Sequence, residues 1–376
     1  MGTIEWTKIH ERRTFSIVTP ILALLSFLYG LGVRLRVIAY KVIKRRSLPG
    51  FVVSIGNLTA GGTGKTPAAC MLAEWASGEG YAVAILSRGY GGQYGTATLE
   101  VSNGHTILAS PTAAGDEPYL LAKRLSGVPV ILSKKRYLGG LLAHQKFKTH
   151  FYILDDGFQH LNLKRDLDLV LMDASNPFGN GHLLPWGPLR ESINELKRAD
   201  AFIITRSGMD ASRGDLKGFL KKKFPGKPIF SSDHTPEHIV LPNKNRIYPS
   251  HVIKGKRVVA FAGIARPEAF EKILIHLGAH VVFFRAFKDH HNFLPDEIED
   301  LIMRKESFKA DYLITTEKDW VRLETLRPEY ADLAYLTIRF EMLLGREAFF
   351  RMVKEKLAQT GVGEFGVRHV RTKTGE

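Results

Sequence analysis

Short apolar runs alternate with amphipathic segments from Phe51 onward. The first run, residues 51–57 (FVVSIGN), leads through a glycine-rich stretch into residues 65–80, whose apolar positions have helical spacing and which end near Gly78 and Gly80. Further strands are predicted within the runs YAVAILSRGYGG (81–92), VPVILS (128–133), HFYILDDGF (150–158), LDLVLMDAS (167–175) and ADAFIITRS (199–207). This alternation predicts a mostly parallel α/β sheet with helices on both faces, and ligands beyond the carboxyl ends of its strands.

The pattern also predicts how the chain divides. A chain of 376 residues exceeds the usual size of one hydrophobic core, so two domains are expected. Residues 231–251 are polar, contain three prolines and lack a long apolar run. The strand and helix alternation then resumes. We therefore expect an N-terminal segment (1–50), a core domain (51–235), a linker (236–256) and a smaller C-terminal α/β domain (257–376).

An uncharged segment, residues 14–33, lies near the N-terminus with basic residues on both sides. It has the length to cross a hydrocarbon core of roughly 30 Å. Cations at both ends favour a helix that lies in the membrane interface beside anionic head groups. A buried core helix and a true membrane span remain as alternatives. A cleaved signal peptide is not expected, because no small-residue cleavage site follows the apolar run.

Composition and charge restrict the kind of partner. The chain carries 53 Lys and Arg against 38 Asp and Glu, a net charge of +15, which indicates an anionic partner: nucleic acid, a phosphorylated metabolite or an acidic membrane. No nucleic-acid recognition motif accompanies the charge, so no nucleic-acid partner is expected. The single cysteine, Cys70, fits a reducing cytoplasmic compartment. The sequence leaves the oligomeric state open.

The stretch GNLTAGGTGKTP (56–67) has the strand, loop and helix context of a phosphate-binding loop. Its backbone N–H groups must point at phosphate oxygens, which requires small or φ-positive residues such as Gly61, Gly62 and Gly64. The predicted nucleotide-binding residues are Thr59, Ala60, Gly61, Gly62, Thr63, Gly64, Lys65 and Thr66, with Lys65 on the β- and γ-phosphates and the Thr66 hydroxyl on Mg²⁺. Thr59 stands where the usual pattern begins with Gly.

A regulatory nucleoside triphosphatase is the main alternative function. The spacing of AGGTGKT also occurs in dimerising regulatory ATPases, but those have a second lysine where this chain has Ala60. A membrane-associated regulatory P-loop NTPase, which transfers phosphate to no acceptor other than water, nevertheless remains an alternative.

Several carboxylates are candidates for the metal and for proton transfer. Asp155 and Asp156 end one predicted strand, and a phosphate loop needs such a metal-side carboxylate. Asp173 ends another strand and competes for this role. Asp116 and Glu117 precede Pro118 at the start of a predicted helix. They are either ordinary helix-capping residues or members of the site.

Taken in order, the motifs resemble those of the tetraacyldisaccharide 4'-kinase family of lipid A biosynthesis. The resemblance covers nearly the whole chain and rests on GNLTAGGTGKTP (56–67), SRGYGG (87–92), GDEP (115–118), DDGFQH (155–160), FGNGHLLPWGPLRE (178–191), FKDHHNF (287–293) and TTEKD (315–319). It implies ATP- and Mg²⁺-dependent phosphorylation of the 4'-hydroxyl of an acylated glucosamine disaccharide 1-phosphate. It also implies a location on the cytoplasmic face of the inner membrane, beside anionic lipids.

The resemblance also implies roles for individual residues. Asp116 is paired with His290 for proton transfer, with His291 as a neighbouring candidate, and Lys65 assists catalysis. The implied metal ligands are Thr66, Glu117 and Asp155, with Asp156 close by. The implied lipid-substrate contacts are Arg88, Tyr90, Arg136, Gln159 and His160. By a weaker analogy with base-reading strand ends, Glu317, Lys318 and Asp319 are expected near the adenine or ribose. Because Asp116 and His290 belong to different predicted domains, catalysis is expected to require domain closure.

Overall fold

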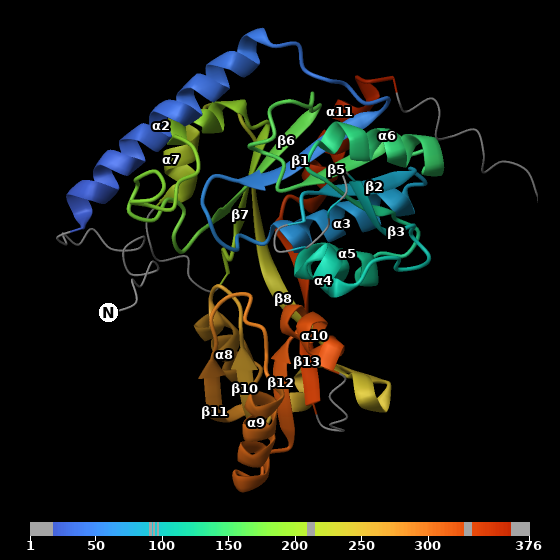
Figure 1. Ribbon diagram of the computed structural model, residues 1–376, viewed down its shortest axis with the longest axis vertical. Helices are drawn as coiled ribbons and strands as arrows, with labels where there is room; N and C mark the ends of the chain where they lie inside the picture. Colours follow the sequence, from blue (N-terminus) through green and yellow to red (C-terminus); the bar gives the residue numbers. More distant parts are fainter. Residues whose placement is uncertain are drawn as a thin grey trace, which may run out of the picture.

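The computed structural model describes residues 18–89, 92, 95, 98–208, 215–326 and 333–361, which form two lobes (Figure 1). The larger upper lobe in Figure 1 is the core lobe, and the smaller lower one is the C-terminal lobe. In these residues a continuous sheet runs in the order β11-β10-β12-β13-β8-β7-β6-β1-β5-β2-β4-β3, with β9 paired to β8. The strands are β1 (Phe51–Asn57), β2 (Val83–Ser87), β3 (Thr98–Ser102), β4 (Val130–Ser133), β5 (Phe151–Asp155), β6 (Leu167–Asp173), β7 (Ala201–Thr205), β8 (Ile229–Leu241), β9 (Arg246–Pro249), β10 (Arg257–Ala262), β11 (His280–Ala286), β12 (Tyr312–Thr316) and β13 (Leu333–Leu344).

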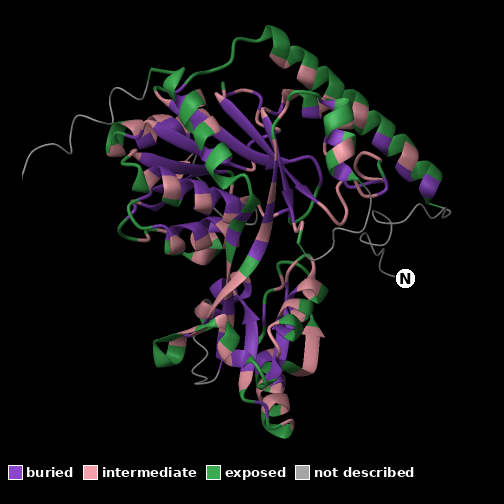
Figure 2. Ribbon diagram, turned by 180° about the vertical axis from the view of Figure 1, so that it is seen from behind, coloured by how far each residue is buried: buried purple, intermediate pink, exposed green. Residues whose placement is uncertain are grey.

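The core lobe confirms the predicted mostly parallel sheet. β1 pairs in parallel with β5 on one side and β6 on the other, and from β7 to β4 the neighbouring strands are all parallel, while the edge strand β3 is antiparallel to β4. Every residue of β1, β5 and β6 is buried, as the purple strands in Figure 2 show. Strands covered on both faces read as continuous apolar runs, which is why these segments were recognisable in the sequence.

Helices cover both faces of the sheet. α3 begins at the end of the glycine-rich loop and buries Leu72, Ala73 and Ala76 against β1, β2 and β5. The described α-helices are α2 (Thr19–Val42), α3 (Lys65–Gly78), α4 (Pro111–Ala114), α5 (Asp116–Arg124), α6 (Arg136–Phe147), α7 (Leu216–Lys223), α8 (Pro267–His276), α9 (Pro295–Ser307), α10 (Glu317–Leu323) and α11 (Arg346–Ala358). The predicted helix at 65–80 is therefore confirmed as α3.

The expected C-terminal domain at 257–376 does not hold together as one unit. β10, β11, β12 and helices α8, α9 and α10 form the C-terminal lobe, but α11 returns to the core lobe (Figure 1). There Phe349 and Val353 join the core around α3, and the ring of Phe350 stacks on Trp75 at 4.6 Å between centroids. The chain thus crosses between the lobes a second time through β13.

The predicted linker at 236–256 is also wrong in its local structure. It contains the end of β8, all of β9 and a short 3₁₀ helix, Ser250–Ile253. β8 and β13 are antiparallel and run together from one lobe into the other. Pro236 lies opposite Ile338 where the register shifts, and a bulge tolerates a residue without an N–H donor. The strand was missed because its exposed positions are polar.

Helix α2 lies along the outside of the core lobe (Figure 1). It continues past the uncharged stretch to Val42, and the part of the segment before Val18 lies outside the described residues. The helix is long and apolar enough to cross a membrane, and only 11% of its most apolar 18 residues are buried in the protein. The alternative of a buried core helix is therefore wrong. Large apolar side chains face outward along it, including Leu24, Phe27, Leu28, Leu35 and Ile38.

Candidate active site

The glycine-rich loop has the backbone geometry of a phosphate-binding loop. Gly61 and Gly64 have φ of 118° and 86°, and Gly64 is the N-cap of α3, which begins at Lys65. A Cβ atom on Gly64 would lie 2.5 Å from Nε2 of the buried His234. Conformation and space therefore both require glycine at this position. The helix N-terminus adds a positive electrostatic end where an anion binds.

The first two residues of this loop, Thr59 and Ala60, are held by backbone contacts, and neither is a glycine. The N–H of Ala60 donates to the carbonyl of Pro188 at 2.7 Å, and Thr59 forms an antiparallel bridge with Leu189. These bonds tie the loop to the segment 178–191. A threonine is compatible with extended backbone at an antiparallel bridge, which explains the departure from the usual pattern.

Two neighbouring acids at the end of β5 have opposite environments. Asp155 is 2% exposed, and its Oδ1 has no hydrogen-bond partner among the described residues. Burial, followed by Glu117 and Asp156, raises the pKa of Asp155 to about 7. Asp156 instead meets Arg190 at 2.7 Å and Lys65 at 3.6 Å. Burial works against ionisation of Asp156, but these cations outweigh it and lower its pKa.

Asp173, the competing acid, is occupied by two guanidinium groups. Arg206 forms an ion pair with its carboxylate, and Arg266 from the C-terminal lobe lies 2.9 Å from Oδ2. Burial is outweighed by the two arginines, and the pKa of Asp173 is lowered. The geometry therefore favours Asp155 over Asp173 as a metal ligand, because Asp155 has an oxygen that no other described group occupies.

The donor set at the phosphate loop fits Mg²⁺. Thr66, the second residue of α3, and the buried Asp155 line the same cleft, and Oδ1 of Asp155 has no partner among the described residues. No cluster of three His, Cys, Asp or Glu side chains suited to a metal occurs in the described part of the chain. Mg²⁺ is usually held by one or two carboxylates together with substrate phosphates rather than by a complete protein cage. Oxygen donors at this loop match that preference.

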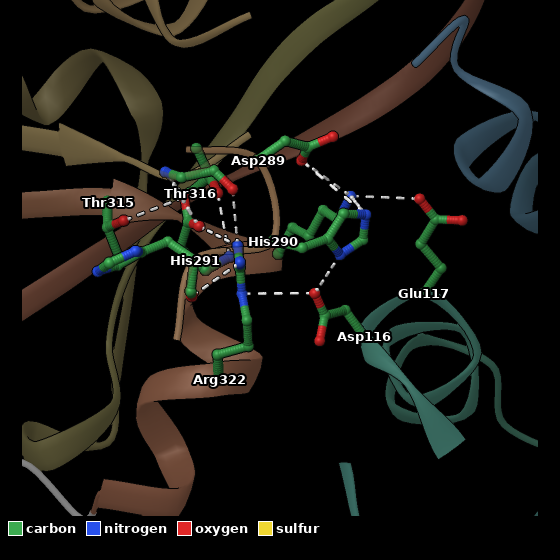
Figure 3. Close-up of polar contacts among 11 residues, drawn as sticks. Asp116, Glu117, Asp289, His290, His291, Thr315, Thr316 and Arg322 are labelled. Carbon is green, nitrogen blue, oxygen red and sulfur yellow. Dashed lines mark hydrogen bonds and ion pairs between the residues drawn. The ribbon is translucent and has the colours of Figure 1, made fainter. Parts of the chain in front are cut away.

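Asp116 and His290 come from different lobes and are in contact (Figure 3). Nδ1 of His290 lies 2.9 Å from Oδ2 of Asp116, the first residue of α5. No side-chain cap bond forms at the start of α5, because the N-cap is Gly115. The capping interpretation of Asp116 is therefore not supported. His291 is oriented differently, with Nε2 2.8 Å from Oε2 of Glu297 on its own lobe.

The predicted lipid-contact residues gather around His160. Gln159 donates from Nε2 to the carbonyl of Asn57 at 2.9 Å. Burial, followed by nearby arginines, lowers the pKa of His160 to about 4; these are Arg136, Arg165, Arg88 and Arg36. Tyr90 lies outside the described residues. Arg36 and Arg165 of this group pair with Glu191 and Asp168, and Arg136 is buried, so Arg88 is the arginine of the four that lines the cleft.

The predicted adenine contacts in TTEKD have other partners. Asp319 is fully buried, accepts from the N–H of Gly263 and pairs with Arg322. Glu317 forms an ion pair with Arg124 of the core lobe. The expectation that these two acids read the nucleotide base is not supported. Lys318 lies between Glu117, at 3.3 Å, and Nε2 of His290, also at 3.3 Å.

Sequence reasoning missed several charged members of the site. Arg190, which holds Asp156, stands inside the quoted motif 178–191, so the signal was present but unassigned. Arg322 follows TTEKD by three residues, and one helical turn from Asp319 brings it back to the same face. Arg36 of α2 donates to Glu191 at 3.0 Å, which no local pattern could have revealed.

The phosphate loop and the Asp116–His290 pair line one cleft of about 1020 Å³ between the lobes, whereas Arg136, Gln159 and His160 are not among its lining residues. Its walls include the phosphate loop (61–66), Arg88, Asp116, Asp155, His290, Lys318 and Arg322. A phosphate loop, a buried strand-end carboxylate and an acid–imidazole pair in one cleft define a P-loop phosphotransferase.

Comparison with known proteins narrows this class. Residues 18–358 match the profile of the tetraacyldisaccharide-1-P 4'-kinases (LpxK), and the chain belongs to this family. It is 38% identical to the tetraacyldisaccharide 4'-kinase of Pelobacter propionicus, over 90% of this chain and 91% of the relative. It is 41% identical to that of Desulfatibacillum aliphaticivorans, over 90% and 92%. The structure of LpxK from Aquifex aeolicus in complex with ATP matches at a TM-score of 0.73 and 32% identity, covering 91% of this chain and 100% of that one.

Proposed function

We propose that this protein transfers the γ-phosphate of ATP to the 4'-hydroxyl of a tetraacylated glucosamine disaccharide 1-phosphate, a step of lipid A biosynthesis. The observation that carries the proposal is the single cleft that joins a phosphate loop to the Asp116–His290 pair. Membership of the tetraacyldisaccharide-1-P 4'-kinase family supports it. A regulatory NTPase needs no acid–imidazole pair on the acceptor side of the cleft, so that alternative is not favoured.

Asp116 is the group we assign to the acceptor. A sugar hydroxyl is a poor nucleophile at neutral pH, and a positioned base contributes about 10² to 10⁴ in rate. Asp116 accepts the 4'-hydroxyl proton as the new O–P bond forms and the bond from the γ-phosphorus to the bridging oxygen breaks, releasing ADP. His290, through Nδ1, orients the carboxylate. Lys65 compensates the negative charge on the transferred group.

Thr66 and Asp155 would hold Mg²⁺ at the phosphate loop. The ion would supply charge neutralisation across the β- and γ-phosphates. Glu117, on the acceptor side, and Asp156 complete the set of candidate ligands. Asp156 is already held by Lys65 and Arg190, so we assign it to positioning Lys65 rather than to direct coordination.

The arginine cluster around His160 is the site we assign to the substrate's 1-phosphate. Arg88 and Arg136 supply guanidinium forks, which match phosphate geometry. A neutral His160 and the amide of Gln159 can hydrogen-bond to sugar hydroxyls. Tyr90 belongs to this proposed set from its motif alone.

Helix α2 is the element we assign to the membrane. Each buried CH₂ of an acyl chain holds a lipid in the bilayer by about 0.8 kcal/mol, so a tetraacylated substrate stays there. The outward apolar side chains of α2 suit the acyl region, and the exposed Arg34 and Lys41 suit anionic head groups. Tyr29 and Arg36 of the helix contact Arg190 and Glu191, which supports a membrane-facing side close to the phosphate loop. We place the protein on the cytoplasmic face of the inner membrane, where ATP is available.

The activity is tested with γ-labelled ATP, Mg²⁺ and the acylated disaccharide 1-phosphate in mixed micelles. Label in the lipid is the expected result. Label that appears only in free phosphate would support the regulatory NTPase instead. The same assay with a disaccharide that lacks the 4'-hydroxyl should give no labelled lipid.

Membrane attachment is tested by flotation with anionic and with neutral vesicles. We expect binding to anionic vesicles that high salt weakens but does not abolish, because salt screens charges but not apolar burial. The double substitution Leu24→Ser with Leu28→Ser should release the protein, whereas Ile247→Ser, an exposed apolar residue of β9, should not. Complete release of the unmodified protein by salt would exclude α2 from the acyl region.

A further inference from the structure

Arg322 of α10 lies where the lobes meet (Figure 3). It contacts Asp116 on the core lobe and the backbone beside His290 on its own lobe. We propose that Arg322 is a positioning residue. It fixes His290 on one lobe and Asp116 on the other, so that the two side chains are aligned at the acceptor end of the cleft when the lobes come together. This inference rests on the proposed function, because it concerns the same Asp116–His290 pair.

Within its own lobe, Arg322 supports the backbone on both sides of His290. Its Nη1 donates to the carbonyl of His291 at 3.0 Å, and Nη2 donates to the carbonyl of Gly263 at 2.9 Å. The N–H of His290 donates to that same Gly263 carbonyl at 3.1 Å. Asp319 pairs with the guanidinium and also accepts from the N–H of Gly263. Arg322, Asp319 and Gly263 thus form one network that anchors the His290 turn.

This anchoring is needed because His290 has an unfavourable backbone conformation. Its φ is 58°, in the left-handed region, which a non-glycine residue adopts only at a cost in free energy. Such residues persist where surrounding contacts determine the conformation. Without the carbonyl bonds from Arg322, the turn has less to hold His290 in the orientation that meets Asp116.

Across the lobes, Arg322 reaches the carboxylate itself. Its Nε lies 3.4 Å from Oδ2 of Asp116, the same oxygen that meets Nδ1 of His290 at 2.9 Å. The side chain of Arg322 is 7% exposed and that of Asp116 is 13% exposed, so solvent screens this contact little. Other charged groups face the pair from the same cleft: Lys318, Glu117 and Asp289.

The chemistry of this position is specific to arginine. A guanidinium is planar and presents five N–H donors, so it can serve two carbonyls and two carboxylates at fixed angles. A lysine at the same place keeps the charge near Asp319 and Asp116 but cannot make the two carbonyl bonds together with both ion pairs. Arg322→Lys therefore separates positioning from simple charge balance.

The test compares Arg322→Lys in the full chain with the matched control Arg304→Lys. Arg304 is on α9 of the same lobe and pairs with Asp300 at 2.9 Å, away from the cleft. For Arg322→Lys we expect kcat for lipid phosphorylation to fall about 30- to 100-fold, in the range of a lost orienting contact, while the KM for ATP changes less than about threefold. The control should retain both parameters.

A double-mutant cycle with Asp116→Asn tests whether Arg322 acts through the pair. Once Asp116 can no longer accept the proton, Arg322→Lys should lower kcat by less than about threefold further. An equal further loss in that background would overturn the proposal. So would normal turnover by Arg322→Lys, or a loss of ATP binding that parallels the loss of kcat, which would indicate general structural damage.

The same data separate failure of this inference from failure of the proposed function. If Asp116→Asn alone turns over normally, the assignment of Asp116 as base is wrong. If Asp116→Asn is slow but Arg322→Lys is normal, the base assignment stands and only the role of Arg322 fails.

Discussion

The two ends of the cleft are built in different ways. At the phosphate end, the loop from Gly61 to Thr66, its strand and its helix all lie in the core lobe and follow one another in sequence. At the acceptor end, Asp116 comes from the core lobe and His290 from the C-terminal lobe, 174 residues later. The phosphate end positions a ligand with backbone N–H groups, while the acceptor end relies on side chains that meet only when the lobes are close.

Because of this difference, substitutions disturb the two ends of the cleft in different ways. Backbone geometry at the phosphate end depends on local conformation and on the space beside it. Side-chain geometry at the acceptor end depends on ion pairs between lobes, such as Arg124–Glu317 and Lys318–Glu117. Substitutions at the two ends should therefore differ in which kinetic parameter they change.

Lys65→Ala should have the largest effect. Lys65 contacts Asn57 and Asp156 and would turn from them to the transferred phosphate. Loss of a cation that stabilises the phosphoryl transition state costs about 10³ to 10⁵ in rate, so transfer should nearly disappear. ATP binding, measured by calorimetry, should weaken as well. Lys146→Ala, an exposed lysine of the same lobe, is the control and should behave like the unmodified protein.

Asp116→Ala should affect the acceptor step rather than ATP binding. We expect kcat to fall about 10³-fold, within the range of a lost general base, with little change in the KM for ATP. Steady-state assays at varied ATP and lipid concentrations measure both. Asp300→Asn, at a partly exposed acid of α9, serves as the control. Normal turnover by Asp116→Ala would remove the distinction between the two ends.

Gly64→Ala and Gly80→Ala separate strain from crowding at the phosphate end. Both glycines have φ of 86°, so both substitutions carry a conformational cost of about 1 to 2 kcal/mol. A Cβ on Gly64 meets His234, whereas a Cβ on Gly80 has no atom within 4 Å. We expect Gly64→Ala to lower transfer about 10- to 100-fold beyond Gly80→Ala, because ligand geometry is sensitive to a shift of the loop. Equal activities would show that strain alone matters.

The sequence predicted the phosphate end in detail because its determinants are local. The buried strand 51–57, the glycines and Gly-Lys-Thr lie in one stretch, and β1 and α3 appear there with nearly the expected bounds. The core strands were recognisable for the same reason, since burial on both faces leaves continuous apolar runs.

The acceptor end was predictable only in part. The pairing of Asp116 with His290 came from a family resemblance, since no spacing rule joins residues so distant in sequence. Arg322 and Arg36 were missed because their partners are defined by lobe contact and by the docking of α2. The end of β8 falls in the predicted linker because its polar and proline residues resemble a loop, while its strand form depends on pairing with β13.

His160→Gln should produce the smallest effect and test the electrostatics of the acceptor end. Burial and the surrounding arginines lower the pKa of His160 from 6.5 to about 4. The folded protein therefore holds this imidazole neutral, while the unfolded chain protonates it below pH 6.5. Acidification from pH 7 to pH 5 should then cost folding free energy on the order of 1 to 2 kcal/mol through this residue.

Glutamine cannot take up a proton, so His160→Gln should remove that part of the acid sensitivity. Thermal unfolding at pH 7 and pH 5 measures it as a smaller difference in Tm for the variant than for the unmodified protein. His105→Gln, at an exposed histidine of the core lobe, should leave the difference unchanged. If His160→Gln keeps the full acid sensitivity, the imidazole does not titrate against the arginines, and the cluster is more open to solvent than its contacts indicate.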